Sequence, residues 1–310
     1  MYRKSIFKSI ALVVLIVLIL AATQPVQSAG QDKAPISLYI AYNSNNIPYA
    51  EYFATARQLG EMLEEKIGYT VVVKVPHGDW VSSHDKVIKA IQKDKADMAW
   101  LMWSAYMVAH DTANAQIAVN PVYTGQTYYQ AQILTHDQTG ILDLADIEGR
   151  SICWVDPLSA SGYIIPSLML MAANVMPETD PQFLGSHPNV VRALYEQQCD
   201  AGATFVDARE TLLEELPDIY SVVPVVAISP PIPHNGFAFA QNFPTNRRDA
   251  IVQALVEISE TEEGLELLMV IIGPTLDRLT PVDHSIYNGL DTLFMEANLT
   301  AEQVWETYYH

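Results

Sequence analysis

Along residues 36–103, the spacing of apolar residues alternates between the period of a β-strand and the period of an α-helix. Ile36–Tyr42 (ISLYIAY) alternates with the period of two that is typical of a strand. Apolar side chains then recur at helical spacing over residues 48–67, and Gly68 is suited to end that helix. The same logic predicts a strand, a helix and a strand at residues 70–75, 82–96 and 97–103. Alternating elements of this size predict a parallel sheet with helices on both faces.

The pattern starts again near residue 126 and predicts a second α/β lobe. Two stretches, Gln126–Asp137 and Ser221–Ala240, are predicted to be extended. Between them the pattern predicts a strand, two helices, a strand and a helix, at residues 149–156, 161–175, 186–198, 199–206 and 207–216. The remainder of the chain from residue 247 is predicted to be helical.

Two α/β sets joined by two extended hinge segments predict a bilobal clamshell whose lobes are discontinuous in sequence. We expect residues 30–127 and 237–310 to form the first lobe and residues 128–236 the second. The C-terminal helices would then return to the first lobe. A ligand is expected in the cleft, near the carboxyl ends of strands and the amino ends of helices.

Residues 1–29 have the order of a secretory signal peptide. Three basic residues, Arg3, Lys4 and Lys8, come first. Ile10–Ala22 is then an unbroken apolar run, and small residues follow it. An uncleaved membrane anchor is the alternative, since about 13–17 apolar residues are short for a span. The segment contains no cysteine, so we do not expect a lipoprotein. We expect the mature chain in the periplasm or another extracytoplasmic compartment.

The charge of the chain narrows the range of partners. The 310 residues carry a formal net charge of −19, and removal of the basic leader makes the remainder more negative still. A surface of this sign repels nucleic acid and anionic membranes, so we expect neither as a partner. The same repulsion between copies favours a monomer. A bound anion must therefore be held by local dipoles rather than by overall charge.

Cys153 and Cys199 are the only cysteines in the sequence. Both lie next to predicted strands of the second lobe. In an exported protein they could form a disulfide, and buried free thiols are the alternative. Their spacing matches no metal motif, and the chain has neither a P-loop nor a dinucleotide-binding fingerprint. We therefore expect no metal and no cofactor.

The stretch VDPLSASGYIIPSLML, at Val155–Leu170, combines small hydroxyl residues with the predicted start of a helix. The hydroxyls of Ser159 and Ser161 and the free N–H groups of the first turn would point at one spot. The helix dipole favours an anion there. Gly162 would let the backbone approach a ligand closely. The alternative is that Ser161 merely caps its helix.

Three motifs in order resemble the periplasmic phosphonate- and phosphite-binding proteins of ABC importers. The motifs are KVIKAIQKDKADMAWLMWSAYMVA (residues 86–109), LDLADIEGRSICWVDPLSASGYIIPSLML (142–170) and FLGSHPNVVRALYEQQCDAGATFVD (183–207). The likeness extends over most of the mature chain, from about residue 36 to residue 287. It implies a type II periplasmic-binding fold with the phosphonate held in the cleft between the lobes.

The resemblance also implies which residues hold the oxyanion. Carried over residue by residue, these are the hydroxyls of Ser159 and Ser161 and the backbone amides of Ala160 and Ser161. His187 would add a side-chain contact, and it can donate a hydrogen bond even when neutral. The alternative for His187 is that it only caps its own helix.

Further positions of the family's site fall on aromatic and polar residues. Trp80 occupies an aromatic position of the first lobe, with a plain role in the core as the alternative. Tyr128 and Tyr129 match another aromatic position, and which of the two faces the ligand stays open. Two carboxylates that bind the amine of aminoalkylphosphonates fall on Asp207 and Asn235. Asn235 lacks the carboxylate, which puts an amino-bearing ligand in doubt, and Asp207 could instead cap the helix that follows it.

The resemblance implies an extracytoplasmic receptor that delivers a phosphonate, phosphite or related oxyanion such as phosphate to the permease subunits of an ABC importer. Such a protein performs no chemistry. Substrate preference would depend on the space around the fourth substituent of the phosphorus atom.

Other functions stay open from sequence alone. The same clamshell could report ligand occupancy to a membrane receptor as a sensor subunit. It could also bind a different solute, such as a quaternary amine held by aromatic faces. A hydrolase that uses Ser159 or Ser161 with His187 is disfavoured, because neither serine lies in a Gly-x-Ser-x-Gly elbow.

Overall fold

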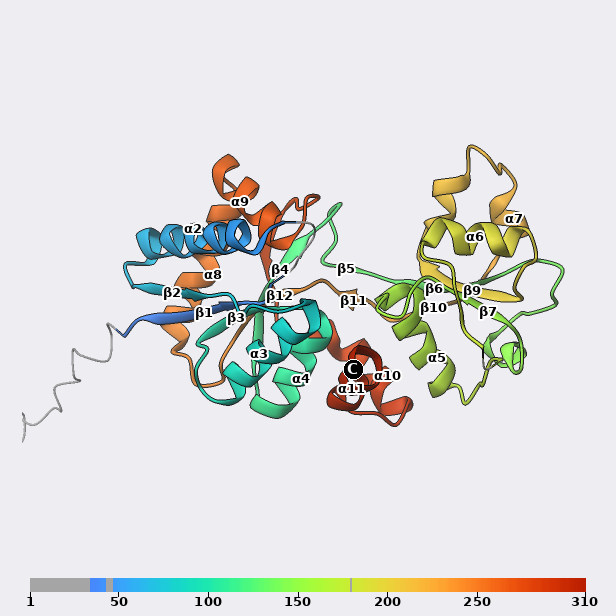
Figure 1. Cartoon of the computed structure of the whole chain (residues 1–310), viewed down its shortest axis with the longest axis horizontal. Coiled ribbons are helices and arrows are strands. Elements are labelled where there is room, and N and C mark those ends of the chain that lie inside the picture. Colours follow the sequence, from blue (N-terminus) through green and yellow to red (C-terminus); the bar gives the residue numbers. More distant parts are fainter. Residues whose placement is uncertain (1–33, 43–46, 179) are drawn as a thin grey trace, which may run out of the picture. The chain divides into compact units, whose positions relative to one another are not determined.

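The computed structural model describes residues 34–42, 47–178 and 180–310 of the chain. The predicted signal peptide, residues 1–29, lies outside the described residues. Within the described ranges, no helix has the length and apolar character needed to cross a membrane. Most of the described strands belong to two mixed sheets, and helices lie on both faces of each (Figure 1).

The first sheet has six strands in the order β13-β4-β12-β3-β1-β2. The bounds of its strands are Ile36–Ile40 (β1), Val71–Lys74 (β2), Met98–Leu101 (β3), Gln116–Val122 (β4), Gly236–Phe239 (β12) and Arg278–Pro281 (β13). Strands β1, β2 and β3 are parallel, as predicted. Strand β12 lies antiparallel between β3 and β4, and β13 lies antiparallel beside β4. The sheet is therefore mixed, and its strands are discontinuous in sequence.

Helices cover both faces of the first sheet, so its central strand β3 is buried on both sides. Met98 and Trp100 pack in the same core as α2, α8 and α9. Ala99 and Leu101 alternate with them and pack in the same core as α3 and α4. The bounds of these helices are Tyr49–Ile67 (α2), Trp80–Gln92 (α3), Trp103–Ala113 (α4), Thr245–Ser259 (α8) and Glu262–Ile272 (α9).

The second sheet has five strands in the order β10-β6-β9-β7-β8. The bounds of its strands are Ala131–Thr135 (β6), Ile152–Trp154 (β7), Gln182–Phe183 (β8), Ala201–Phe205 (β9) and Val225–Ile228 (β10). Ile152 and Trp154 share a core with α5, which spans Ile165–Ala172. Cys153, between them, shares a core with α6, which spans His187–Tyr195. The two helices therefore cover opposite faces of the sheet.

The chain crosses between the two sheets twice, and the two crossings pair with each other. Strand β5 (Tyr128–Tyr129) leads to the second sheet, and β11 (Ile232–Pro233) leads back to the first. They form a two-stranded antiparallel ribbon in which Tyr129 pairs with Ile232. The prediction of two α/β lobes joined by two extended segments is thereby confirmed. We keep the lobe boundaries at residues 127/128 and 236/237 as a proposal, which the membership of the strands supports.

Two C-terminal helices follow β13, namely α10 (Asn288–Glu296) and α11 (Ala301–Tyr309). Helix α11 packs against α4, as expected for a tail that returns to the first lobe. Helix α10 also packs against α5, beside the second sheet. The tail thus contacts helices that belong to both sheets.

Three local expectations from the sequence are wrong. The strand expected at residues 97–103 ends at Leu101, because α4 begins at Trp103. The helix expected at residues 207–216 is only a 3-10 turn over Ala208–Leu212, and the side chain of its Arg209 is buried. The tail is not wholly helical, since it contains the edge strand β13.

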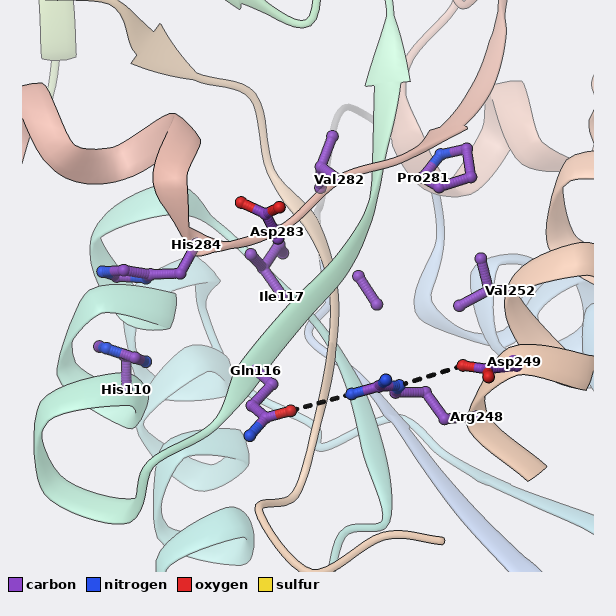
Figure 2. A pocket seen from close by; sticks show the side chains of 11 residues that line it. His110, Gln116, Ile117, Arg248, Asp249, Val252, Pro281, Val282, Asp283 and His284 are labelled. Atoms are coloured by element: carbon purple, nitrogen blue, oxygen red, sulfur yellow. Dashed lines mark hydrogen bonds and ion pairs between the residues drawn. The ribbon is translucent and has the colours of Figure 1, made fainter. Parts of the chain in front are cut away.

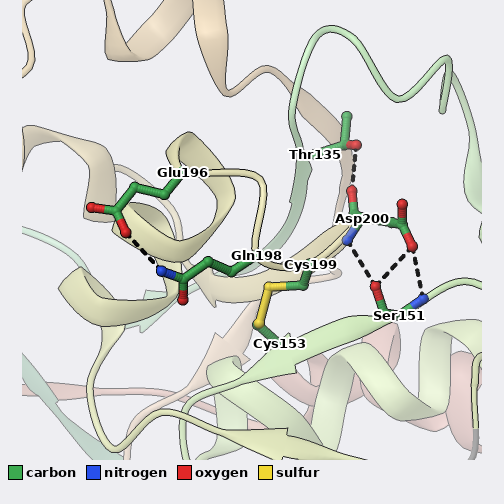
Figure 3. The surroundings of a disulfide bond; sticks show 7 residues. All are labelled: Thr135, Ser151, Cys153, Glu196, Gln198, Cys199 and Asp200. Atoms are coloured by element: carbon green, nitrogen blue, oxygen red, sulfur yellow. Dashed lines mark hydrogen bonds between the residues drawn. A yellow bond between two sulfur atoms is a disulfide. The ribbon is translucent and has the colours of Figure 1, made fainter.

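A disulfide joins Cys153 of β7 to Cys199, which lies just before β9 (Figure 3). The Cα atoms are 6.0 Å apart, and both cysteines are buried. Next to the bridge, Ser151 Oγ donates to Asp200 Oδ2 at 2.7 Å, and Thr135 Oγ1 donates to the Asp200 carbonyl at 2.7 Å. Of the two alternatives that the sequence leaves open, the structure contains the paired cysteines.

We expect the double variant Cys153→Ala/Cys199→Ala to lose about 2–4 kcal/mol of unfolding free energy. The bridge joins residues 46 apart, and its loss returns conformational freedom to the unfolded chain. Urea unfolding with and without dithiothreitol would measure this loss. Reductant should destabilise the native protein and leave the variant unchanged. Equal urea midpoints for the native protein in both conditions would contradict this account.

Candidate ligand-binding site

The serine turn after β7 gives its two serines different roles. Ser159 Oγ accepts a hydrogen bond from Gly162 N at 3.0 Å and so caps the following helical segment. That segment is a π-helical turn, Ala160–Ile164, which continues directly into α5. Ser161 is not the cap. The residue is only 5% exposed and lines a cavity.

Gly162 has a packing role in this turn. A Cβ atom at this position would clash with the side chain of Val155, so only glycine lets the helical segment lie against the end of β7. The close approach expected from the sequence is therefore made to Val155. It brings Ser161 beside the carboxyl end of the strand.

His187 begins α6, but it does not cap that helix. Ser186 is the cap, since its Oγ accepts from Asn189 N at 3.3 Å. The Nδ1 atom of His187 instead accepts a hydrogen bond from Phe205 N, at 3.3 Å, at the end of β9. Burial lowers the pKa of His187, and the nearby Asp156 carboxylate opposes this only in part. A neutral ring whose Nδ1 accepts carries its proton on Nε2, which can donate to a ligand.

One cavity of about 580 Å³ brings together five of the residues that the sequence singles out. They are Ser161, His187, Tyr128, Tyr129 and Asp207. The sequence reasoning missed four further lining residues, Gln126, Gln130, Phe205 and Val206. Each of these four lies within two positions of a predicted site residue in the sequence. No local sequence pattern marks them as ligand-binding residues.

Strand topology explains why these residues meet. Strands β7 and β9 are parallel neighbours in the second sheet. The serine turn follows β7 and Asp207 follows β9, so both lie at the same edge of the sheet. Asp207 is exposed, has a left-handed backbone (φ 68°) and makes no side-chain capping bond. The capping alternative for Asp207 is therefore excluded.

The cavity offers neutral donors to a ligand. Among its lining residues as described, none is a lysine or an arginine, and Asp207 supplies the one carboxylate. Burial raises the pKa of Tyr129, so its hydroxyl stays protonated at neutral pH. An anion in this cavity would be bound by hydroxyl and imidazole donors and by backbone dipoles rather than by a cationic side chain.

Four predicted site residues do not line this cavity, namely Ser159, Ala160, Trp80 and Asn235. Trp80 starts α3, and its ring packs against His84 at 5.6 Å and Tyr309 at 5.9 Å between centroids. Asn235 Oδ1 accepts from Trp103 N at 3.3 Å and so satisfies the first turn of α4. A ligand-binding role for these four residues stays a prediction.

A separate cavity of about 450 Å³ lies beside α4, β4, α8 and residues 281–284 (Figure 2). The rings of His110 and His284 stack there with centroids 3.7 Å apart. Arg248 Nη1 donates to Gln116 Oε1 at 2.9 Å. As described, this cavity is lined by none of the residues that the sequence singles out, so it is not part of the candidate site.

Comparison with known families identifies the class of protein. Residues 47–287 match the family described as ABC transporter, phosphonate, periplasmic substrate-binding protein. The chain therefore belongs to this family, as the sequence motifs predicted. The family consists of binding proteins, which confirms the expectation that the chain is not an enzyme.

Two curated relatives are distant. The phosphonates-binding periplasmic protein of Escherichia coli (strain K12) is 23% identical over 213 residues, which cover 66% of this chain and 62% of that protein. The phosphate-import protein PhnD of Mycolicibacterium smegmatis is 28% identical over 160 residues, covering 47% of this chain and 48% of that protein. The aligned part spans less than two thirds of either relative's length.

Solved structures show a similar fold. XAC2383 from Xanthomonas citri bound to ATP has a TM-score of 0.58 at 13% identity, covering 90% of this chain and 100% of that chain. PhnD1 from Prochlorococcus marinus (MIT 9301) in complex with methylphosphonate has a TM-score of 0.50 at 13% identity, covering 85% of this chain and 98% of that chain. At this identity the likeness concerns the fold alone, and the predicted type II periplasmic-binding fold is confirmed.

The half-buried His234 predicts a loss of stability in acid. Burial lowers the pKa of His234 to about 4, against about 6.5 in an unfolded chain. The native state thus binds fewer protons between these values, so its stability is complete above about pH 6.5 and falls as the pH drops towards 4. We expect His234→Gln to reduce the slope of this part of the stability profile, measured by urea unfolding from pH 7.5 to about 4. The exposed His77→Gln variant is the control, and equal slopes in the native protein and His234→Gln would refute the assignment.

Proposed function

We propose that this chain binds a phosphonate-type oxyanion in the cavity lined by Ser161 and His187. The single observation that carries the proposal is the convergence of neutral donors on one cavity at the carboxyl ends of β7 and β9. A phosphonate, phosphite or phosphate group presents several acceptor oxygens around a tetrahedral centre. The lining residues that carry such donors belong to the serine turn, to α6 and to β5, so this group would be contacted from different elements.

The electrostatics of the site support an oxyanion held without a counterion. The chain as a whole is strongly negative, so it attracts no anion by its overall charge. Burial keeps His187 neutral, with Nε2–H as a donor. Hydrogen bonds to a charged ligand contribute about 1.5–3 kcal/mol each, so a few of them suffice for useful affinity.

We further propose that the bound ligand is delivered to the membrane permease of an ABC importer from the periplasm. The family match and the predicted signal peptide at residues 1–29 support this proposal. A buried disulfide is also typical of proteins that fold in an oxidising compartment. The strong like charge on each copy favours a monomeric receptor.

A ligand panel followed by serine variants tests the binding site. Thermal unfolding of residues 30–310 would be measured with phosphite, methylphosphonate, aminoethylphosphonate, phosphate and sulfate. A ligand at 100 times its Kd adds about 2.7 kcal/mol of stability and shifts Tm clearly. We expect a shift with at least one phosphorus oxyanion. No shift with any of them, in a folded protein, would remove this ligand class.

Two serines two residues apart are expected to respond differently. Ser161→Ala should weaken the binding of the best ligand about tenfold or more, with little change in unfolding free energy, because it removes a donor in the cavity. Ser159→Ala should instead lower the unfolding free energy by about 1 kcal/mol, because it removes a cap. Isothermal titration and urea unfolding measure the two effects. Ser167→Ala on α5 is the matched control, and unchanged affinity in Ser161→Ala would move the site elsewhere.

A further inference from the structure

A second cavity, of about 660 Å³, adjoins the candidate oxyanion site. The two cavities share four lining residues, Gln126, Tyr128, Tyr129 and Phe205. A ligand whose oxyanion group lies beside Ser161 and His187 can therefore extend past β5 into the second cavity. We call this second cavity the aromatic compartment, after the rings of Tyr123, Tyr129 and His234 that line it.

The rings of the aromatic compartment contact one another and are held by the backbone. The His234 ring stacks on Tyr129, with centroids 5.2 Å apart and planes 19° apart. It also meets Tyr123 in an edge arrangement, with centroids 4.6 Å apart. His234 N donates to the Thr127 carbonyl at 3.2 Å, and the His234 carbonyl accepts from Asn120 Nδ2 at 2.9 Å. Tyr129 and His234 are thus fixed relative to each other by the paired crossing segments, and Tyr123 joins them from the end of β4.

The wall of the aromatic compartment is uncharged at neutral pH. As described, its lining includes no lysine, arginine, aspartate or glutamate. Burial keeps His234 neutral and raises the pKa of Tyr123 to about 12, so neither ring carries charge. The carboxylate of Asp207 lies in the adjoining cavity instead. A cation here would be attracted only by the ring faces and would meet no carboxylate among the lining residues, whereas an uncharged apolar group has no charge to desolvate.

We propose that the preferred ligand is an organic phosphonate with an uncharged aromatic or branched apolar substituent, which occupies the aromatic compartment. This inference rests on the proposed function for the oxyanion end of the ligand. Two aromatic rings that pack together gain more than their buried area alone provides, and a branched apolar group gains in proportion to the area it buries. The smallest phosphorus oxyanions do not reach the aromatic compartment, which then stays filled with water. They therefore bind without this additional favourable contact.

A series of ligands tests the proposal on the native chain. Isothermal titration would compare methylphosphonate, benzylphosphonate, a phosphonate with a tert-butylethyl substituent, and its isostere with trimethylammonium in place of tert-butyl. We expect benzylphosphonate and the tert-butylethyl compound to bind about tenfold or more tightly than methylphosphonate. The quaternary ammonium isostere should bind more weakly than its neutral counterpart.

The outcomes separate this inference from the proposed function. Methylphosphonate binding as tight as that of the larger ligands would overturn the inference and leave the oxyanion site standing. Tighter binding of the ammonium isostere would overturn it as well, because the compartment would then be a cation site. No binding of any phosphonate would overturn this inference, and it would overturn the proposed function as well if phosphite and phosphate also failed to bind.

Substitution of Tyr123 localises the effect. Tyr123→Ala should abolish the preference for large substituents and leave the affinity for methylphosphonate unchanged, because Tyr123 lines only the aromatic compartment of the two cavities. Tyr123→Phe keeps the ring and should keep the preference. A preference that survives Tyr123→Ala would overturn the assignment. If Tyr123→Ala does not fold, the ligand series on the native chain decides the matter alone.

Discussion

The parallel pairing of β7 with β9 is the constraint on which the candidate site depends. Ile152 pairs with Ala201 and Cys153 with Gly202, so the two strands run in the same direction and end at the same edge. A side chain at Gly202 would clash with Val190 of α6, and its absence lets α6 lie close to the sheet. The disulfide joins Cys153, in the middle of β7, to Cys199, which lies two residues before β9. The pairing of β7 with β9 therefore fixes where the serine turn and Asp207, which follow these strands, lie relative to each other.

The site combines an anion-binding chemistry with a strongly negative chain. Its donors are neutral groups whose orientation is set by contacts within the second lobe. His187 is an example. Its Nδ1 accepts a hydrogen bond from Phe205 N, and burial lowers its pKa, so the ring is oriented and uncharged. Because no cationic side chain is described in the cavity, selectivity depends on where the donors point and on what surrounds the rest of the ligand. The two-stranded ribbon of β5 and β11 contributes Tyr128 and Tyr129 to the wall around the rest of the ligand.

Local sequence patterns were sufficient for much of the architecture. The alternation at Ile36–Tyr42 and the helical spacing that follows it correspond to β1 and α2. The two extended stretches correspond to the crossing segments, and the serine turn was recognised from its composition and its place before an apolar helix. These features depend on neighbours within a few residues, which is the range over which backbone propensity and side-chain periodicity act.

Contacts between distant residues decided the rest. The sequence alone determined that Ser159 and Ser161 lie in a turn before a helix, but only the tertiary structure decided that Ser159 caps it and Ser161 faces the cavity. The hydrogen bond between Phe205 N and His187 and the disulfide between Cys153 and Cys199 also join residues that are distant in sequence. The hydrogen bond from Trp103 N to Asn235 joins residues that are 132 positions apart. The insertion of β12 between β3 and β4 is of the same kind. Local periodicity carries no information on such pairings, because they depend on which apolar faces are buried against each other when the whole chain folds.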